Sequence, residues 1–455
     1  MFKNHLKIAW RSLKKQPFFT FLNTFGLAVG MAGALLISLY IYDELSFDKM
    51  FADADRIFRI DTDIKFGGAE INASEVAAPM AAAMQRDFSQ VEKTVRFRDR
   101  GSLLLRKSGT DTNTKELHVT FVDSTFFDFF GIDLLVGDGK TALTQPNTLI
   151  MTTTAAEKHF GVQNALGQSL LLNNTDTYTV TGVIEDLPKN SFLRDHTIFM
   201  AMAGYEDSRE NLWGSTNYFT LVKLIPSVNI ADFQEPLQSI FEKYLIPWAQ
   251  DTFPGMTAES FEASGNYIRY HTMPLIDIHL YSNRQSEMSA NSSIQNVYIL
   301  SFIGLFLMLL AAVNFMNLST AHSLKRAKEV GVKKTLGLSK KQLMFQYIFE
   351  IVLQGFISFI LSLIIVELAL PFFNEFVETD ISILHTNSLF TLLLSVIFVS
   401  LLVGSIPAFY LSNFKAVEVL KGSISKSKKG NFIRNMMLGL QFLISGFFII
   451  SMLIV

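Results

Sequence analysis

Five long apolar runs dominate the hydrophobic pattern of this chain. The first, residues 18–42, has 25 residues, and the second, residues 297–318, has 22 residues and no charge. At a rise of about 1.5 Å per residue, helices of this length cross the ~30 Å hydrocarbon core of a bilayer. The other runs lie at 347–373, 389–411 and 436–455. The pattern therefore predicts five membrane-spanning helices.

The charges between these runs predict the topology. The segment 319–346, called the basic loop below, has one acid, Glu329, against seven basic residues: Lys325, Arg326, Lys328, Lys333, Lys334, Lys340 and Lys341. Residues 412–435 are also mostly basic among their charged residues, whereas 373–388 contain three acids and no Lys or Arg. Because short basic loops stay on the cytoplasmic side, we expect a multi-pass protein with a cytoplasmic N-terminus. The basic loop is then either a docking surface for a cytoplasmic partner or only an orientation signal.

The basic loop also has the pattern of a structured segment. Apolar residues lie among its charges, at Val330, Val332, Leu336 and Leu338. We expect a helical extension of the preceding span, a turn near Gly337 and Leu338, and a new helix capped by Ser339, whose hydroxyl can accept from a free backbone N–H.

Residues 43–296 separate the first two spans and have the pattern of a folded domain. They carry 21 Lys and Arg against 34 Asp and Glu, although the whole chain has a net charge of -2. Two sets of strand, helix and strand are predicted, at 57–64, 75–88 and 94–98, and again at 218–225, 230–244 and 267–273. We expect both sets in one lobe and a strand-rich inserted lobe at about 115–215, with the phenylalanines of FFDFF (126–130) in its core.

The predicted fold class is therefore an α-helical integral membrane protein. It has a large α+β extracytoplasmic domain, composed of two lobes and inserted between membrane helices 1 and 2.

Residues 1–17 predict an amphipathic helix, with Leu6, Trp10 and Leu13 on its apolar face and lysines on the other. Such a helix can lie on anionic headgroups, or pack beside the basic loop and touch a cytoplasmic partner. Gly26 and Gly30 have the spacing that lets membrane helices approach closely, although glycine is also common in such helices.

Polar residues interrupt some of the runs. Glu350 and Glu367 lie near opposite ends of the third run, where an interfacial position costs little, and the alternative is a transport pathway. Asn314 and Asn317 are predicted to form hydrogen bonds between helices. The end of the chain, from KKGNFIRNMM, echoes its basic and aromatic beginning, which predicts the start of a truncated second repeat at 436–455.

Enzyme chemistry finds little support in the sequence. The chain has no cysteine and no GxxxxGK[ST] phosphate loop. The sequence therefore predicts no cofactor on this chain and no catalytic residue. His271, Asp277 and His279 form the nearest approach to a metal-ligand cluster, and structural histidines are the better interpretation. The excess of Asp and Glu over Lys and Arg in residues 43–296 indicates no nucleic-acid partner.

The arrangement resembles the MacB and FtsX-type family of ABC transporter permeases. The resemblance rests on one anchor helix, a large external domain, further spans, and RAKEVGVKKTLGLSKKQL in the basic loop. FDKMFADADRIFRI, FVDSTFFDFFGIDLLVGD, AEKHFG and VTGVIEDLPKNS support it in the external domain. The fifth run departs from the four-span form and resembles the double-length permeases instead.

The resemblance implies a permease of the bacterial inner membrane. It implies a cytoplasmic ABC ATPase dimer, which holds the ATP and docks on the basic loop. The further partners it implies are a second permease half or copy, the lipid bilayer and an envelope partner. The implied substrate is a peptide, lipid, lipoprotein or drug. By match to the motif, the candidate ATPase-coupling residues are Arg326, Glu329, Gly331, Lys333, Lys334, Gly337 and Gln342. The alternative is a membrane-anchored signalling or scaffold protein that regulates an envelope partner without transport.

Overall fold

A computed structural model describes residues 2–325 and 327–383, with 435–436, 438–439, 441–446 and 450. The chain forms two compact units, one of residues 1–42 and 295–455 and one of residues 43–294. The predicted fourth span, 389–411, lies outside the described residues, as do nearly all of the linker 412–435 and much of the fifth run, 436–455.

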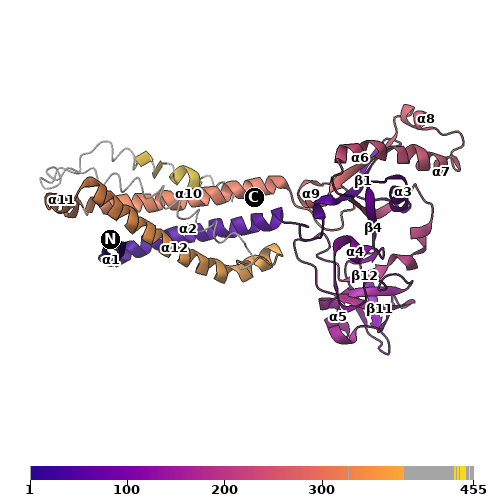
Figure 1. Cartoon of the computed structure of the whole chain (residues 1–455), viewed down its shortest axis with the longest axis horizontal. Helices are drawn as coiled ribbons and strands as arrows, with labels where there is room; N and C mark the ends of the chain where they lie inside the picture. Colours follow the sequence, from indigo (N-terminus) through magenta and orange to yellow (C-terminus); the bar gives the residue numbers. More distant parts are fainter. Residues whose placement is uncertain are drawn as a thin grey trace. The chain divides into compact units, whose positions relative to one another are not determined.

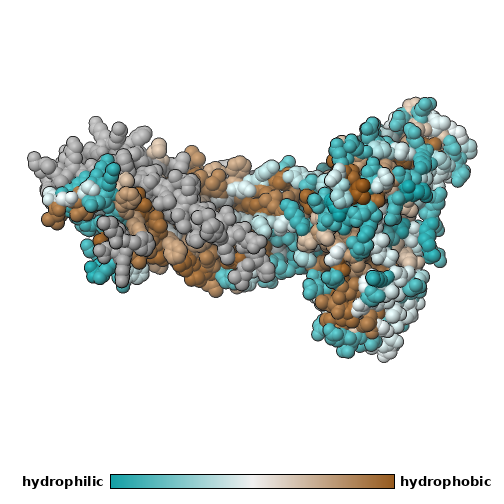
Figure 2. All heavy atoms as spheres, in the orientation of Figure 1, coloured by the Kyte–Doolittle hydropathy of each residue, from teal (hydrophilic) through white to brown (hydrophobic). Residues whose placement is uncertain are grey.

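The first unit is helical (Figure 1). Its helices are α1 (Phe2–Lys14), α2 (Pro17–Leu45), α10 (Ile294–Lys325), α11 (Ala327–Thr335) and α12 (Lys340–Val377). Within the described residues, three stretches are long and apolar enough to cross a membrane: Pro17–Leu45, Ile294–Ser319 and Lys340–Val377. Each contains one of the first three predicted spans. Apolar surface follows α10 and α12 in Figure 2, and Phe356, Ile364 and Phe372 of α12 are exposed, as lipid-facing residues would be.

Small residues bring α2 and α10 together. A Cβ atom added at Gly30 would lie 2.3 Å from the Cβ of Ala311, and one added at Gly26 would lie 3.3 Å from Nδ2 of Asn314. Backbones this close leave no room for a side chain at Gly30. The predicted helix-packing role of these glycines is confirmed. Asn317 also bonds between helices, because its Nδ2 donates to Oε1 of Gln441 at 3.4 Å.

The second unit contains a 14-stranded sheet with short helices. The strands are β1 (Ile57–Phe66), β2 (Ala69–Ala73), β3 (Val76–Ala77), β4 (Val91–Asp99), β5 (Leu103–Lys107), β6 (Asn113–Glu116), β7 (Val119–Val122), β8 (Leu134–Gly137), β9 (Thr148–Thr152), β10 (Ser169–Leu172), β11 (Asp176–Ile184), β12 (Ile198–Ala201), β13 (Thr216–Leu224) and β14 (Tyr267–Pro274). The helices are α3 (Met80–Asp87), α4 (Phe126–Phe130), α5 (Thr153–His159), α6 (Ile230–Leu237), α7 (Ile246–Gln250), α8 (Ala258–Ala263) and α9 (Leu275–Tyr281). Short helical turns lie at Ala54–Arg56, Val162–Asn164, Met202–Gly204, Glu206–Arg209 and Phe241–Leu245.

The two predicted strand-helix-strand sets interlock in this sheet. Strands β14, β1, β13 and β4 are neighbours in that order, and each adjacent pair is antiparallel. Each set therefore contributes two parallel strands with one strand of the other set between them, which is the split β-α-β arrangement. The two sets form one continuous part of the sheet, as predicted.

The expected helix at 75–88 is shorter than predicted. Val76 and Ala77 form β3 and pair with β13, and the helix begins only at Met80, after Pro79. Val76 is fully buried in this strand, so its contact with a distant strand outweighs the helical spacing of the sequence.

The segment between β4 and β13 supplies β5 to β12, and β7 pairs with β4, so the sheet runs on into this segment. The four phenylalanines of α4 are buried in the hydrophobic core, as expected. A division of the unit into two lobes remains a prediction.

Candidate coupling surface

The described candidate coupling residues lie on α11 and at the start of α12 (Figure 1). Glu329, Gly331, Lys333 and Lys334 are on α11, Gly337 is in the turn, and Gln342 is in the first turn of α12. Arg326 lies outside the described residues. Their coupling role stays a prediction, but the structure separates residues that shape the turn from residues that form its surface.

Gly337 ends α11. It has a φ of +94°, in the left-handed region that favours glycine. The N–H of Gly337 donates to the carbonyl of Lys334 at 3.0 Å, and the N–H of Leu338 donates to the carbonyl of Lys333 at 3.1 Å. This pair of bonds is a Schellman motif, which satisfies carbonyls that the helix end would leave open.

Ser339 and Gln342 begin α12. The Ser339 hydroxyl accepts from the N–H of Gln342 at 3.3 Å, and the Gln342 side chain accepts from the N–H of Ser339 at 2.9 Å. This capping box confirms the predicted Ser339 cap and contributes about 1 kcal/mol. Gln342 is therefore a residue that stabilises the start of the helix.

A small apolar core fixes the angle between the two helices. Val330 of α11 and Leu343 of α12 are fully buried, Tyr347 is 2% exposed, and Leu338 packs against them. Burial of an apolar side chain contributes about 1.5–3 kcal/mol. With a capped helix on each side, this core makes the turn a rigid unit.

The exposed face of the turn combines apolar and basic residues. Val332 is 49% exposed and Leu336 is 77% exposed. Lys333 and Lys334 are half-buried beside them, and Lys333 Nζ lies 3.0 Å from Oε1 of Glu329. Partial burial lowers the pKa of Lys334, and the nearby charge of Lys340 adds to this effect. Such a face suits a protein partner that offers an apolar pocket with acidic groups around it.

Sequence reasoning grouped Val330, Val332, Leu336 and Leu338 together as apolar residues among charges. The structure divides them into an inner pair, Val330 and Leu338, and an outer pair, Val332 and Leu336. The outer pair has helical i, i+4 spacing, which was the available signal. These two residues join the candidate surface.

The histidines considered as metal ligands are held by carboxylates. His271 Nε2 lies 2.8 Å from Oδ2 of Asp63, and His279 Nε2 lies 3.3 Å from Oε2 of Glu44. The His279 ring also stacks on Phe47 at a centroid distance of 3.6 Å. Among the described residues, no three His, Cys, Asp or Glu side chains group closely enough to hold a metal ion. These contacts give His271 and His279 structural roles.

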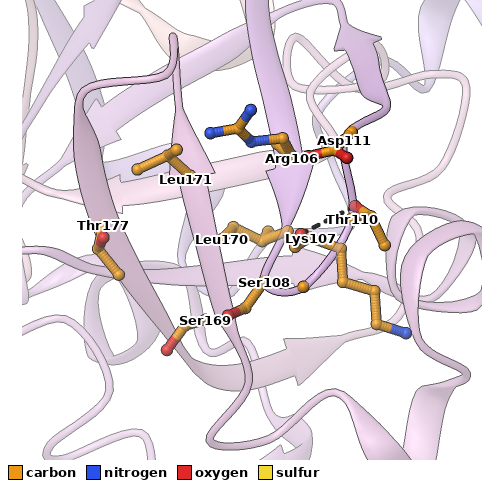
Figure 3. Close-up of a pocket in the computed structure, with 10 residues that line it drawn as sticks. Arg106, Lys107, Ser108, Thr110, Asp111, Ser169, Leu170, Leu171 and Thr177 are labelled. Carbon is orange, nitrogen blue, oxygen red and sulfur yellow. Dashed lines mark hydrogen bonds between the residues drawn. The ribbon is translucent and has the colours of Figure 1, made fainter.

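An open hollow of about 460 Å³ lies in the second unit beside the loop between β5 and β6 (Figure 3). Its lining includes Arg106, Lys107, Asp111 and the hydroxyls of Ser169 and Thr177. The Thr110 hydroxyl donates to the carbonyl of Lys107 at 2.9 Å and shapes the loop. Mixed charges on an open sheet face give this hollow no distinct chemistry.

Two family descriptions match the chain. Residues 20–240 match the MacB-like periplasmic core domain, and residues 301–416 match the FtsX-like permease C-terminal domain. The chain is 21% identical over 428 residues to the "Probable syringafactin export ATP-binding/permease protein SyfD" of Pseudomonas syringae pv. tomato. That alignment covers 92% of this chain, and the chain spans 59% of the length of the relative.

Solved structures are similar to part of the chain. One is a domain described as part of a permease from Porphyromonas gingivalis, with 22% identity, a TM-score of 0.43, and coverage of 55% of this chain and 98% of that one. Another is the periplasmic region of MacB from Actinobacillus actinomycetemcomitans, with 14% identity, a TM-score of 0.33, and coverage of 50% and 92%.

Apolar helices of membrane-spanning length, an α+β domain in the same chain and the match to a permease domain together define a membrane protein of the permease class. Within that class, the chain belongs to the MacB/FtsX-type permeases, as both family matches agree.

Proposed function

We propose that this chain is the permease subunit of an ABC-type transporter. A separate cytoplasmic ATPase dimer binds and hydrolyses ATP, and the permease couples this to movement of its extracytoplasmic domain. The observation that carries the proposal is the rigid turn between α11 and α12, which presents Val332, Leu336, Lys333 and Lys334 and continues directly into a candidate membrane span. A rigid turn passes on a push that a flexible loop would absorb.

The chain is a multi-pass protein of the bacterial inner membrane in this proposal. The basic loop and the N-terminus face the cytoplasm, and residues 43–294 form a two-lobed domain outside. A second permease half or copy completes the assembly, and an envelope partner receives the substrate. The substrate that is exported or extracted is a peptide, lipid, lipoprotein or drug. The name of the Pseudomonas relative refers to export, which supports that direction.

Co-purification tests the docking step. The intact protein is purified with a K333E/K334E double variant, and we expect the ATPase to accompany the wild type and to be lost from the variant. The matched control is K49E/K140E, which reverses two exposed lysines of the second unit and leaves the turn unchanged. Equal recovery of the ATPase with both double variants would remove the basic loop as the docking surface.

A second measurement separates this proposal from the scaffold alternative. Deleting the gene of the co-purified ATPase should abolish export or extraction of the substrate by the permease. Normal activity in that strain would favour a scaffold that works without ATP.

A further inference from the structure

A row of buried polar side chains runs along α12. Gln346, Glu350, Gln354, Ser358 and Ser362 follow at every fourth position, and all are at most 8% exposed. Residues four apart share one face of a helix, so the row forms a stripe on an otherwise apolar span. Buried polar groups are costly unless they are hydrogen-bonded, so a stripe of this kind requires partners on other helices.

The partners come from α1 and from the beginning of α2. The Ser12 hydroxyl donates to Oε1 of Glu350 at 2.9 Å. Nε2 of Gln354 donates to the Thr24 hydroxyl at 3.0 Å, and the Ser358 hydroxyl donates to the carbonyl of Thr24 at 3.0 Å. Three successive members of the row therefore bond to the N-terminal helices.

The same N-terminal helices are bonded to each other and packed on α12. The Thr20 hydroxyl of α2 donates to the carbonyl of Leu13 at the end of α1, at 2.9 Å. Ala9 and Leu13 are buried, whereas Trp10 is 49% exposed on the other side of α1. Phe345 of α12 is 64% exposed and lies off the polar row. The row is thus the contact face of α12, with an apolar outer face opposite.

We propose that this polar row, centred on Glu350 and Gln354, is the connection through which movement of the basic loop reaches α2. The inference rests on the proposed ATPase-driven function. Helix α12 starts at the capped turn of the basic loop, and α2 continues in the chain to Leu45, where the second unit has begun. Directional hydrogen bonds between buried groups resist sliding more than apolar contacts do. Glu350 and Gln354 are therefore positioning residues that make α1, α2 and α12 move together.

Disulfide crosslinking tests the geometry without any ATPase. The chain has no cysteine, so the two cysteines of an S12C/E350C variant have no native thiol to react with. In native membranes, mild oxidation should crosslink S12C/E350C, detected as a mobility shift after proteolytic cleavage between the two positions. The control pair S12C/F345C places the second cysteine on the exposed face and should not crosslink. Crosslinking of both pairs or of neither would overturn the inference and leave the proposed function standing.

A second experiment tests transmission in the full chain with its ATPase bound. A single Y42C substitution places a reporter on α2, and its rate of reaction with a maleimide is measured with and without ATP. E350Q keeps an oxygen that accepts from Ser12, so the ATP-dependent change in rate should persist, whereas E350L should lose it while the ATPase stays bound.

The other outcomes decide against the inference. An unaltered ATP response in E350L would show that the row does not transmit the movement. Loss of the response in E350Q as well would assign the effect to the charge rather than to the hydrogen bond. Loss of the ATPase from E350L would place Glu350 at the docking surface instead.

Discussion

Replacing Gly30 with alanine tests how closely α2 packs on α10. A Cβ atom at Gly30 would lie 2.3 Å from the Cβ of Ala311, whereas one at Gly33 would meet only Cδ1 of Leu307, at 3.5 Å. Both substitutions change glycine to alanine inside the same helix, so any change in helix propensity is shared. Overpacking costs about 1–3 kcal/mol. We therefore expect G30A to be less stable than G33A by about that amount.

The assay is unfolding of the purified chain in mixed micelles by a rising fraction of SDS, followed by circular dichroism. Adding A311G to G30A removes the clashing methyl group and should restore most of the lost stability. The double-mutant cycle isolates the contact energy because the two residues touch. Equal stability of G30A and G33A, or no rescue by A311G, would refute the close packing of the two helices.

Three further predictions concern pH and topology. Burial lowers the pKa of His196 to about 4, so the unfolded chain binds a proton at this histidine before the native chain does as pH falls from about 6.5 towards 4. The free energy of unfolding should therefore fall by ~3 kcal/mol over this range. H196F should remove this pH dependence in urea unfolding at pH 7 and 4.5, and an unchanged dependence would contradict the prediction. Burial raises the pKa of Asp48 to about 8, so the native chain keeps a proton that the unfolded chain loses near pH 4, and stability falls as pH rises from about 4 to 8. D48N keeps the acceptor for the N–H of Phe192 and should flatten this dependence, whereas a fall as steep as that of the wild type would argue against it. In intact cells, an impermeant maleimide should label K140C at once and L336C only after permeabilisation; labelling of both from the same side would exclude the proposed topology.

Local signals in the sequence were sufficient for the basic loop. The Ser339 cap and the turn near Gly337 were predicted because capping and left-handed turns depend on a few adjacent residues. Gly26 and Gly30 were also recognised from spacing alone. In each case the physics is confined to one or two helical turns.

Contacts between distant segments were beyond sequence reasoning. Val76 has helical spacing with its neighbours, but it pairs with Tyr218 of β13 and becomes part of a strand. Val330 and Val332 are the same residue type two positions apart, yet the first is buried and the second is exposed. The packing of Leu343 and Tyr347 against Val330 decides which of the two valines is buried. Burial therefore had to come from the structure.

The polar residues of α12 show why position within a span is a weak guide. The sequence shows Glu350 only as an interruption near one end of an apolar run, where an interfacial position costs little. The structure gives Glu350 a partner, Ser12, that lies 338 residues away in the chain. Spacing in the sequence gives no sign of this contact, because Ser12 reaches Glu350 only where α1 packs against α12. The same row meets α2 at Gln354 and Ser358, so the polar interruptions of the apolar run mark the face of α12 that binds the two N-terminal helices.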